Sequence, residues 1–255
     1  MDIKNIAEAA KRDLILLKKD YTIIKSIDNS KIKLKNKVIQ ISKSFGKILP
    51  QNNKGNKILE IKPKKKIKIL KNKLKKEKLR YHETNLGGSI HTDGPQLNNP
   101  PNFVFMACIN QAKKGGHSTL VSTKKIYKFL SKNRRNLLKT LTKNFYFEKR
   151  GFSKDKSKSV LFKPIFKKSG DKVTFRYLRE YIEAGYKIKR KNLTLNQIKS
   201  LNYLDNLLSS KKFSINFKLG KGDLLILNNN HVAHGRTKFA LEKNNSRRLI
   251  RVWVK

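Results

Sequence analysis

Residues 87–109 hold the clearest β-structure pattern in the chain: Gly87-Gly-Ser-Ile-His-Thr-Asp-Gly-Pro95, then Asn99-Pro-Pro101, then the apolar run Phe103-Val-Phe-Met-Ala-Cys-Ile109. Glycine and proline break the chain, and aromatic and β-branched side chains fill the run between breaks, which predicts strand, turn and strand. A further break at Lys113-Lys-Gly-Gly116 precedes another expected strand at 118–123.

The same pattern continues toward the C-terminus. We expect strands within 145–180, at 213–219, at 224–227 and at 246–254, a helix at 124–142, and a second helix after the capping box Thr194-Leu-Asn-Gln197. The second helix would bury Ile198, Leu201, Leu204, Leu207 and Leu208. Crossover helices are too few for a parallel sheet. The sequence therefore predicts a mainly β fold with flanking α-helices and a double-stranded β-helix core of the jelly-roll, cupin-like kind.

The N-terminal part is lysine-rich and only weakly patterned. Helical spacing of apolar residues predicts a short amphipathic helix within 1–10. Tyr21–Ile24 predicts a strand, Lys37–Ile41 a strand or the start of a helix, and the second half of 61–70 an edge strand. We expect a single domain over 1–255, in which a lysine-rich part, 1–80, precedes the motif-bearing core, 81–255.

The net charge of +45, from 62 basic and 17 acidic residues, by itself indicates a nucleic acid or anionic surface as partner. However, lysine greatly outnumbers arginine, and the excess is spread over the chain together with many Asn and Ile, as a genome biased toward A and T would produce. No zinc motif, helix-turn-helix or aromatic basic strand is present. We therefore expect no nucleic-acid partner, although a basic nucleic-acid-binding protein and a non-catalytic cupin-like domain remain alternatives.

Cys108 is the single cysteine, so no intrachain disulfide is possible, and its apolar surroundings predict a buried, unreactive thiol. No apolar run approaches the roughly 18 residues of a membrane span. The N-terminus lacks the apolar centre of a signal peptide. We therefore expect a cytoplasmic protein without a membrane partner.

One constellation could bind a metal. His91 and Asp93 are separated by one residue, so on a strand both side chains would share a face. A second histidine from a distant strand would complete a 2-His-1-carboxylate triad, which leaves open positions on Fe(II). His231 and His234 are the candidates for that ligand.

Six segments in order resemble the taurine dioxygenase/TfdA-type branch of 2-oxoglutarate oxygenases, which includes clavaminate synthase-like and γ-butyrobetaine hydroxylase-like enzymes. They are Gly88–Gly94, Pro100-Pro101 with its apolar strand, Gly115–Ser122, Gly222–Asn229, His234–Phe239 and Arg247–Val254. The resemblance implies Fe(II), 2-oxoglutarate and O2, with release of succinate and CO2. It implies oxidation of a C–H bond in a small-molecule substrate, and the cationic residues favour an anionic or amino-acid-like one.

The resemblance also assigns roles to residues. His234, in His-Gly-Arg, would be the second histidine ligand, whereas His231 would face the other way on a strand. Arg247 would anchor 2-oxoglutarate, and Arg251 is the runner-up or a substrate contact. Arg248 is a rival, because a shift of one residue swaps the faces of a strand.

A hydroxyl should join the arginine on the cosubstrate carboxylate, and the pattern places Ser118 there, with Thr119 open as an alternative. Arg176, Tyr177 and Arg179 are candidate substrate contacts, because their segment resembles one that borders the substrate cavity in this branch. An ordinary strand or helix edge with ion pairs is an equally good interpretation of that segment.

Overall fold

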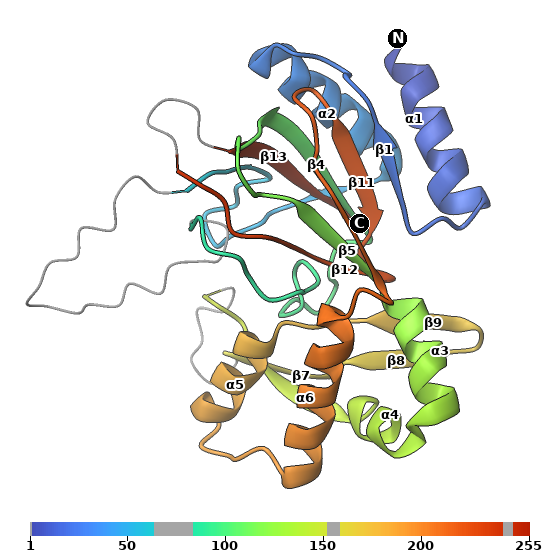
Figure 1. Ribbon diagram of the computed structural model, residues 1–255, viewed down its shortest axis with the longest axis vertical. Coiled ribbons are helices and arrows are strands. Elements are labelled where there is room, and N and C mark those ends of the chain that lie inside the picture. Colours follow the sequence, from blue (N-terminus) through green and yellow to red (C-terminus); the bar gives the residue numbers. More distant parts are fainter. Residues whose placement is uncertain (1, 64–83, 152–158, 242–246) are drawn as a thin grey trace, which may run out of the picture.

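The computed structural model describes residues 2–63, 84–151, 159–241 and 247–255. Two antiparallel sheets pack together in its upper half, and a layer of helices and hairpins lies below them (Figure 1). The larger sheet has the order β1 (Tyr21–Ile24), β11 (Leu224–Asn228), β4 (Phe103–Asn110), β13 (Arg248–Val254) and β2 (Ile48–Leu49), with β3 (Ile58–Ile61) also paired to β13. The smaller sheet has the order β10 (Ser214–Phe217), β5 (Ser118–Ser122) and β12 (Val232–Arg236).

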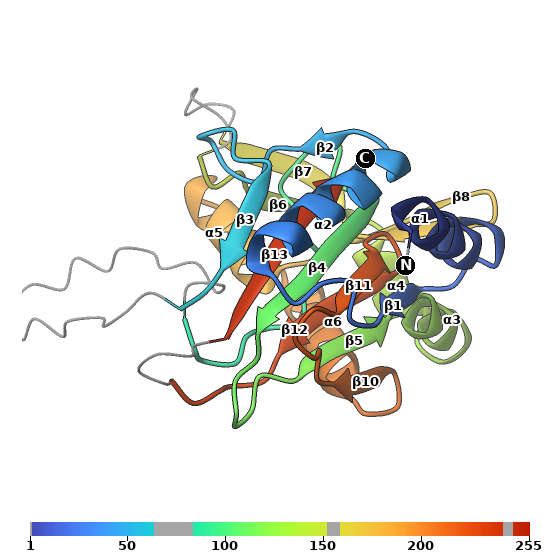
Figure 2. The ribbon, with the colours of Figure 1, turned by 90° about the horizontal axis from the view of Figure 1, so that it is seen from above.

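The remaining elements cover the two sheets. The N-terminal helices are α1 (Ile3–Lys11), the π-helical turn η1 (Arg12–Leu16) and α2 (Lys31–Phe45). The lower layer comprises α3 (Thr123–Asn133), α4 (Arg135–Leu141), the hairpin β6 (Asn144–Glu148) and β7 (Val160–Pro164), the hairpin β8 (Phe166–Ser169) and β9 (Lys172–Phe175), α5 (Arg179–Ile188) and α6 (Leu195–Ser209). Figure 2 shows α1 and α2 together on the outer face of the larger sheet.

The central strands are apolar on both faces because both faces are covered. On β13, Ile250 and Val252 pack outward against the N-terminal helices, while Leu249 and Trp253 point inward, toward the smaller sheet. This alternation places every second residue of β13 in the space between the two sheets. The space is the part of the fold in which a site can form.

The predicted mainly β jelly-roll with flanking helices is confirmed. The amphipathic N-terminal helix and the strand at Tyr21–Ile24 are present, and the capping box does begin α6. Cys108 is buried as expected, and burial raises the pKa of its thiol to about 11. No described helix has the length and apolar character needed to span a membrane.

Several local predictions were wrong or lie outside the described residues. Of the two alternatives for Lys37–Ile41 the helix is confirmed, but these residues lie in the middle of α2 and not at its start. The helix expected at 124–142 is two helices, because the chain leaves the helical conformation at Arg134 (φ −147°). Ile198 does not face the core but remains 36% exposed. The edge strand expected in the second half of 61–70 falls among residues that are not described.

Helix α5 packs closely on β6 at Gly185, and this contact fixes where the start of the helix meets the space between the sheets. A Cβ atom at Gly185 would collide with the carbonyl oxygen of Tyr146. We predict that Gly185→Ala lowers the free energy of unfolding by about 1–3 kcal/mol through overpacking, despite alanine's better helix propensity. Thermal and urea denaturation would measure it.

The control is Lys187→Ala, at an exposed position of the same helix, which should change stability by less than about 0.5 kcal/mol. A Gly185→Ala protein as stable as the wild type would contradict the close packing of α5 on β6.

Candidate metal centre and cavity

The two histidines meet across a single β-bridge. The backbone N–H of His91 donates to the carbonyl of His234 (3.0 Å), and the N–H of His234 donates back (2.7 Å). The expectation that His91 and Asp93 lie on one strand was wrong, since only His91 makes this bridge and Asp93 follows in a bend. Nevertheless the ligand atoms of His91, Asp93 and His234 all lie within 4.8 Å of one another, and all three side chains are buried.

The imidazole rings are oriented as metal ligands require. His91 Nδ1 lies 2.9 Å from the carbonyl oxygen of Ser89, which leaves Nε2 turned toward Asp93, 4.0 Å from Oδ1. His234 Nε2 lies 3.8 Å from Asp93 Oδ2. Burial lowers the pKa of His234 to about 3, so its ring is neutral and carries a lone pair for a cation. Two imidazole side chains and one carboxylate are a ligand set that fits a divalent iron ion.

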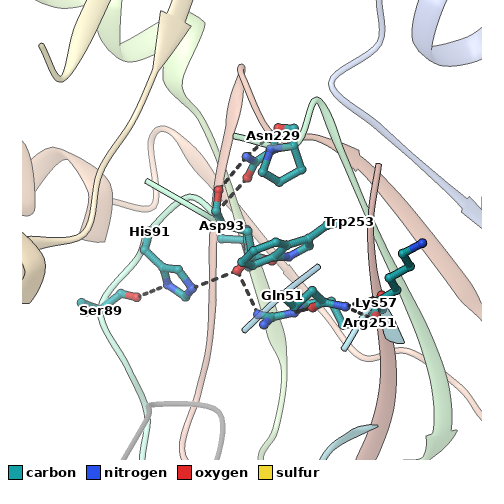
Figure 3. A network of polar contacts seen from close by, with 10 residues as sticks. Gln51, Lys57, Ser89, His91, Asp93, Asn229, Arg251 and Trp253 are labelled. Carbon is teal, nitrogen blue, oxygen red and sulfur yellow. Dashed lines mark hydrogen bonds and ion pairs between the residues drawn. The ribbon is translucent and has the colours of Figure 1, made fainter. Parts of the chain in front are cut away.

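Asp93 is held by donors on both oxygens and on its backbone (Figure 3). Arg251 Nη1 donates to Oδ1 and Trp253 Nε1 donates to Oδ2, each at 2.9 Å. The Asn229 side chain accepts from the Asp93 N–H and donates to its carbonyl, each at 2.9 Å. Burial by itself would raise the pKa of Asp93, but the charge of Arg251 and the other donors hold it below its ordinary value. The carboxylate therefore stays ionised and fixed in direction.

The N-terminal part also reaches this centre. Gln51 Oε1 accepts from Arg251 Nε (2.7 Å), and Gln51 Nε2 donates to the carbonyls of Arg251 (2.8 Å) and Lys57 (2.9 Å) (Figure 3). No sequence pattern singles out Gln51, which lies in the lysine-rich part of the chain. Asn229 is different, because it belongs to the Gly222–Asn229 segment that already carried part of the family pattern.

A cavity of about 560 Å³ opens beside the three ligands. Arg247, buried, and Ser118 both line it, with Leu120, Leu225 and Leu249 among the apolar walls. Each of these residues belongs to, or directly adjoins, a strand of the two facing sheets. The cavity therefore combines a cation and a hydroxyl with an apolar surface.

Glycine leaves room for that cation. Gly116 has φ +73°, a conformation that favours glycine. A Cβ there would lie 3.1 Å from Arg247 Cδ and 3.1 Å from Gln111 Oε1. Gln111 Oε1 in turn accepts from Arg247 Nε at 3.1 Å. The Gly-Gly sequence before β5 thus has a physical reason, since a side chain at Gly116 would crowd the Arg247 side chain.

The structure shows which of the alternative cosubstrate contacts left open by the sequence line the cavity. Thr119 does not line the cavity, because its hydroxyl donates to Asn216 Oδ1 on the neighbouring strand (2.6 Å). Arg248 also lies outside, with Nε 3.7 Å from Glu60 Oε1. Arg251 does line the cavity, but it is paired with Asp93.

The other three candidate substrate contacts, Arg176, Tyr177 and Arg179, do not line the cavity in the described structure. Arg176 donates to two backbone carbonyls, those of Pro95 (2.7 Å) and Leu97 (2.6 Å). The hydroxyl of the buried Tyr177 donates to Asp205 Oδ1 at 2.5 Å, and Arg179 Nη1 also bonds Asp205. These contacts match the alternative interpretation, an element edge with ion pairs.

The neighbours of those residues face the cavity instead. Leu178, Glu180 and Tyr181 line it. The difference arises at the start of α5, where successive residues turn by about 100° around the helix axis. The resemblance therefore indicated a segment that does border the cavity, but Arg176, Tyr177 and Arg179 are not the side chains of it that line the cavity.

Two other histidines lie apart from the triad, and His82 is outside the described residues. His231 sits in the turn before β12, and His117 is exposed ahead of β5. Arg236, by contrast, does line the cavity, and it donates to the backbone carbonyls of Leu86 and Thr84. It braces the segment that leads to His91.

Comparison with known proteins agrees with this geometry. The model of the family described as "Taurine catabolism dioxygenase TauD, TfdA family" matches residues 35–253. FR-33289 synthase of Streptomyces rubellomurinus (strain ATCC 31215) is 23% identical over 216 residues, 82% of this chain and 60% of that protein. Gamma-butyrobetaine dioxygenase of Homo sapiens is 25% identical over 175 residues, 63% of this chain and 42% of that protein. The chain thus spans about half the length of these curated relatives.

Solved structures show the same fold at low sequence identity. Asparagine oxygenase in complex with Fe(II), hydroxyasparagine and succinate matches with a TM-score of 0.71 and 14% identity, over 99% of this chain and 78% of that one. The non-heme iron oxygenase OrfP in complex with Fe, succinate and (3S)-hydroxy-L-Arg matches with a TM-score of 0.70 and 11% identity, over 99% and 81%.

The hydrogen bond from the indole N–H of Trp253 to Asp93 predicts that Trp253 contributes to metal affinity. Trp253→Phe keeps an aromatic ring in the core but removes the donor to Asp93 Oδ2, so the carboxylate loses part of its orientation. We predict that affinity for a divalent metal, measured by Co(II) titration followed by absorbance, falls about 10- to 100-fold. Unchanged affinity in a variant that keeps its fold would contradict this role.

Proposed function

The chain belongs to the taurine catabolism dioxygenase TauD, TfdA family, and on this premise we propose that it is an Fe(II)- and 2-oxoglutarate-dependent oxygenase. His91, Asp93 and His234 would hold the iron. The bound iron supplies the oxidising chemistry, with O2 consumed and 2-oxoglutarate converted to succinate and CO2 while a C–H bond of the substrate is oxidised. The observation that carries the proposal is this buried triad at the wall of a cavity that also contains Arg247.

The residues around the triad would position and shield the reactants. Arg247 would bind the far carboxylate of 2-oxoglutarate through its planar, charged fork. Ser118 would donate its hydroxyl to the same carboxylate. Burial of both, and the apolar walls beside them, would exclude water from the cosubstrate and strengthen this charge pairing.

Arg251 would act through Asp93 rather than on the cosubstrate, because its guanidinium is already engaged by that carboxylate and by Gln51. We accordingly assign the anchoring role to Arg247 and treat Arg251 as a positioning residue. With Trp253, it would keep the Asp93 carboxylate aimed at the metal and would prevent it from binding a proton in the metal-free protein.

The substrate would be a small molecule, anionic or amino-acid-like, and the outcome a hydroxylation or a related C–H oxidation. Asparagine oxygenase and OrfP, which share the fold, hold hydroxylated amino acids in their structures, and this supports the amino-acid alternative. A single domain over 1–255, a cytoplasmic location and the absence of a nucleic-acid partner remain predictions. The first of these is supported by the pairing of β1 and β3, from the N-terminal part, with β11 and β13.

The proposal is tested by turnover without knowledge of the substrate. Under air, with Fe(II), ascorbate and 2-oxoglutarate, we expect wild-type protein to form succinate slowly, and His91→Ala to lose this activity because one of three metal ligands is gone. His117→Ala, which changes an exposed histidine outside the triad, should retain it. Succinate that persists in His91→Ala would contradict the assigned iron site. A wild type that forms neither succinate nor the visible Fe(II)–2-oxoglutarate charge-transfer band without oxygen would overturn the function.

Substitutions at two adjacent arginines test which of them binds 2-oxoglutarate. Arg247→Met removes the buried guanidinium, and we expect the apparent KM for 2-oxoglutarate to rise about 10- to 100-fold, the loss of a charged hydrogen-bonded pair. Arg248→Met changes the half-buried neighbour that pairs with Glu60 and lies outside the cavity, and it should leave this KM within about twofold. The reverse ranking would make Arg248 the anchor.

A further inference from the structure

One acidic side chain in the cavity has no basic partner. The chain has 62 basic and 17 acidic residues, and most of the described acids form ion pairs. Within the described residues, Glu180 forms none, and its hydrogen-bond partner is the Ser89 hydroxyl, which donates to Oε1 at 2.7 Å. The other described acids without an ion pair, Asp2, Glu8 and Asp171, do not line the cavity. Glu180 does.

The adjacent arginine does not neutralise it. Arg179 directs its guanidinium to Glu183 (2.7 Å) and Asp205 (3.0 Å), on the side of α5 away from the cavity. Glu180 thus presents a negative charge to the cavity of a strongly basic protein. A cationic group is the ligand that this charge fits.

Glu180 is also connected to the metal centre. The hydroxyl of Ser89 donates to Glu180, and the backbone carbonyl of the same residue lies 2.9 Å from His91 Nδ1. One residue therefore joins the carboxylate to a proposed iron ligand. A group bound by Glu180 would lie on the His91 side of the cavity, beside the place where oxidation would occur.

A positively charged side chain also lines this cavity. Arg150 lines the cavity, and its guanidinium carbon sits 5.3 Å from the centre of the Tyr181 ring. Its pairing with Glu148 is loose, at 3.6 Å, so a planar anion could still bind the guanidinium. Because Tyr181 follows Glu180 in the chain, a carboxylate and a guanidinium flank the same short stretch of the cavity wall.

We propose that Glu180 and Arg150 form the subsite for the zwitterionic head of a free α-amino acid, with Glu180 binding the ammonium group and Arg150 the carboxylate. The inference rests on the proposed oxygenase function and specifies its substrate class. It gives a role to two charged side chains of the cavity wall that the metal and cosubstrate do not use. The bound amino acid would direct its side chain into the remaining cavity, where size and polarity would select it.

The test measures charge selectivity rather than activity alone. The twenty standard L-amino acids and L-ornithine are titrated into wild-type protein, each against its Nα-acetyl and its carboxamide derivative. Binding is followed by calorimetry and, without oxygen, by perturbation of the Fe(II)–2-oxoglutarate absorption band. For the amino acids that bind, we expect a preference of at least about tenfold over each derivative, because either derivative leaves one charged side chain of the subsite, Glu180 or Arg150, without its partner.

Two variants separate the two charges. Glu180→Gln keeps the size of the side chain and should reduce the preference over the Nα-acetyl form to about twofold or less, while the preference over the carboxamide remains. Arg150→Met should show the opposite pattern. Glu183→Gln, one turn along α5 and outside the cavity, is the matched control and should keep both preferences.

The outcomes distinguish this inference from the proposed function. If the wild type forms the iron–cosubstrate band but binds no free amino acid, or binds the Nα-acetyl forms as well, the subsite is wrong and the oxygenase function stands. If Glu180→Gln only lowers thermal stability and keeps the selectivity, Glu180 merely stabilises the first turn of α5, and the inference fails. If the band is absent but calorimetry shows the expected selectivity, the oxygenase function fails and the amino-acid subsite stands.

Discussion

The ion pair between Arg251 and Asp93 is the interaction on which the site depends. A buried carboxylate costs several kcal/mol unless it is paired and hydrogen-bonded, so its partners must be in place whenever the protein is folded. Arg251 and Trp253 come from the last strand, Asn229 from the end of β11, and Gln51 from the N-terminal part. Compensating one charge therefore joins segments that lie far apart in the chain.

Much of this arrangement could be predicted because strand periodicity and motif order act together. Alternation on β13 places Arg251 and Trp253 between the sheets and sends Arg248 outward, so the register explains why Arg247 lines the cavity and Arg248 does not. The same logic separates Ser118 from Thr119 on β5. The pairing of β13 with β4 shifts register between Arg248 and Leu249. The extra residue is on β4, so the alternation of side chains along β13 is preserved.

The remainder could not be predicted, for two physical reasons. Gln51 contacts Arg251, which lies 200 positions away in the chain. No local sequence pattern around a single polar side chain indicates such a partner. Glu180 was missed because the family resemblance indicated only the segment, and basic or aromatic side chains were singled out in it as contacts for an anionic substrate. The chain passes into α5 at Arg179, so which side chains of this segment face the cavity depends on where the helix begins, and the sequence does not show this.

The surface charge and the cavity charge have different ranges, and this limits what the composition can say about function. The +45 charge attracts anions over distances comparable with the Debye length, about 8 Å at physiological ionic strength, and salt weakens it. Charges inside the cavity act at contact distance and are screened far less. A lysine excess can thus raise the encounter rate with any anion, whereas Glu180, one acid among many bases, would discriminate between ligands at the cavity in its proposed role. The composition could not reveal this, because selectivity depends on which charges line the cavity and not on their sum.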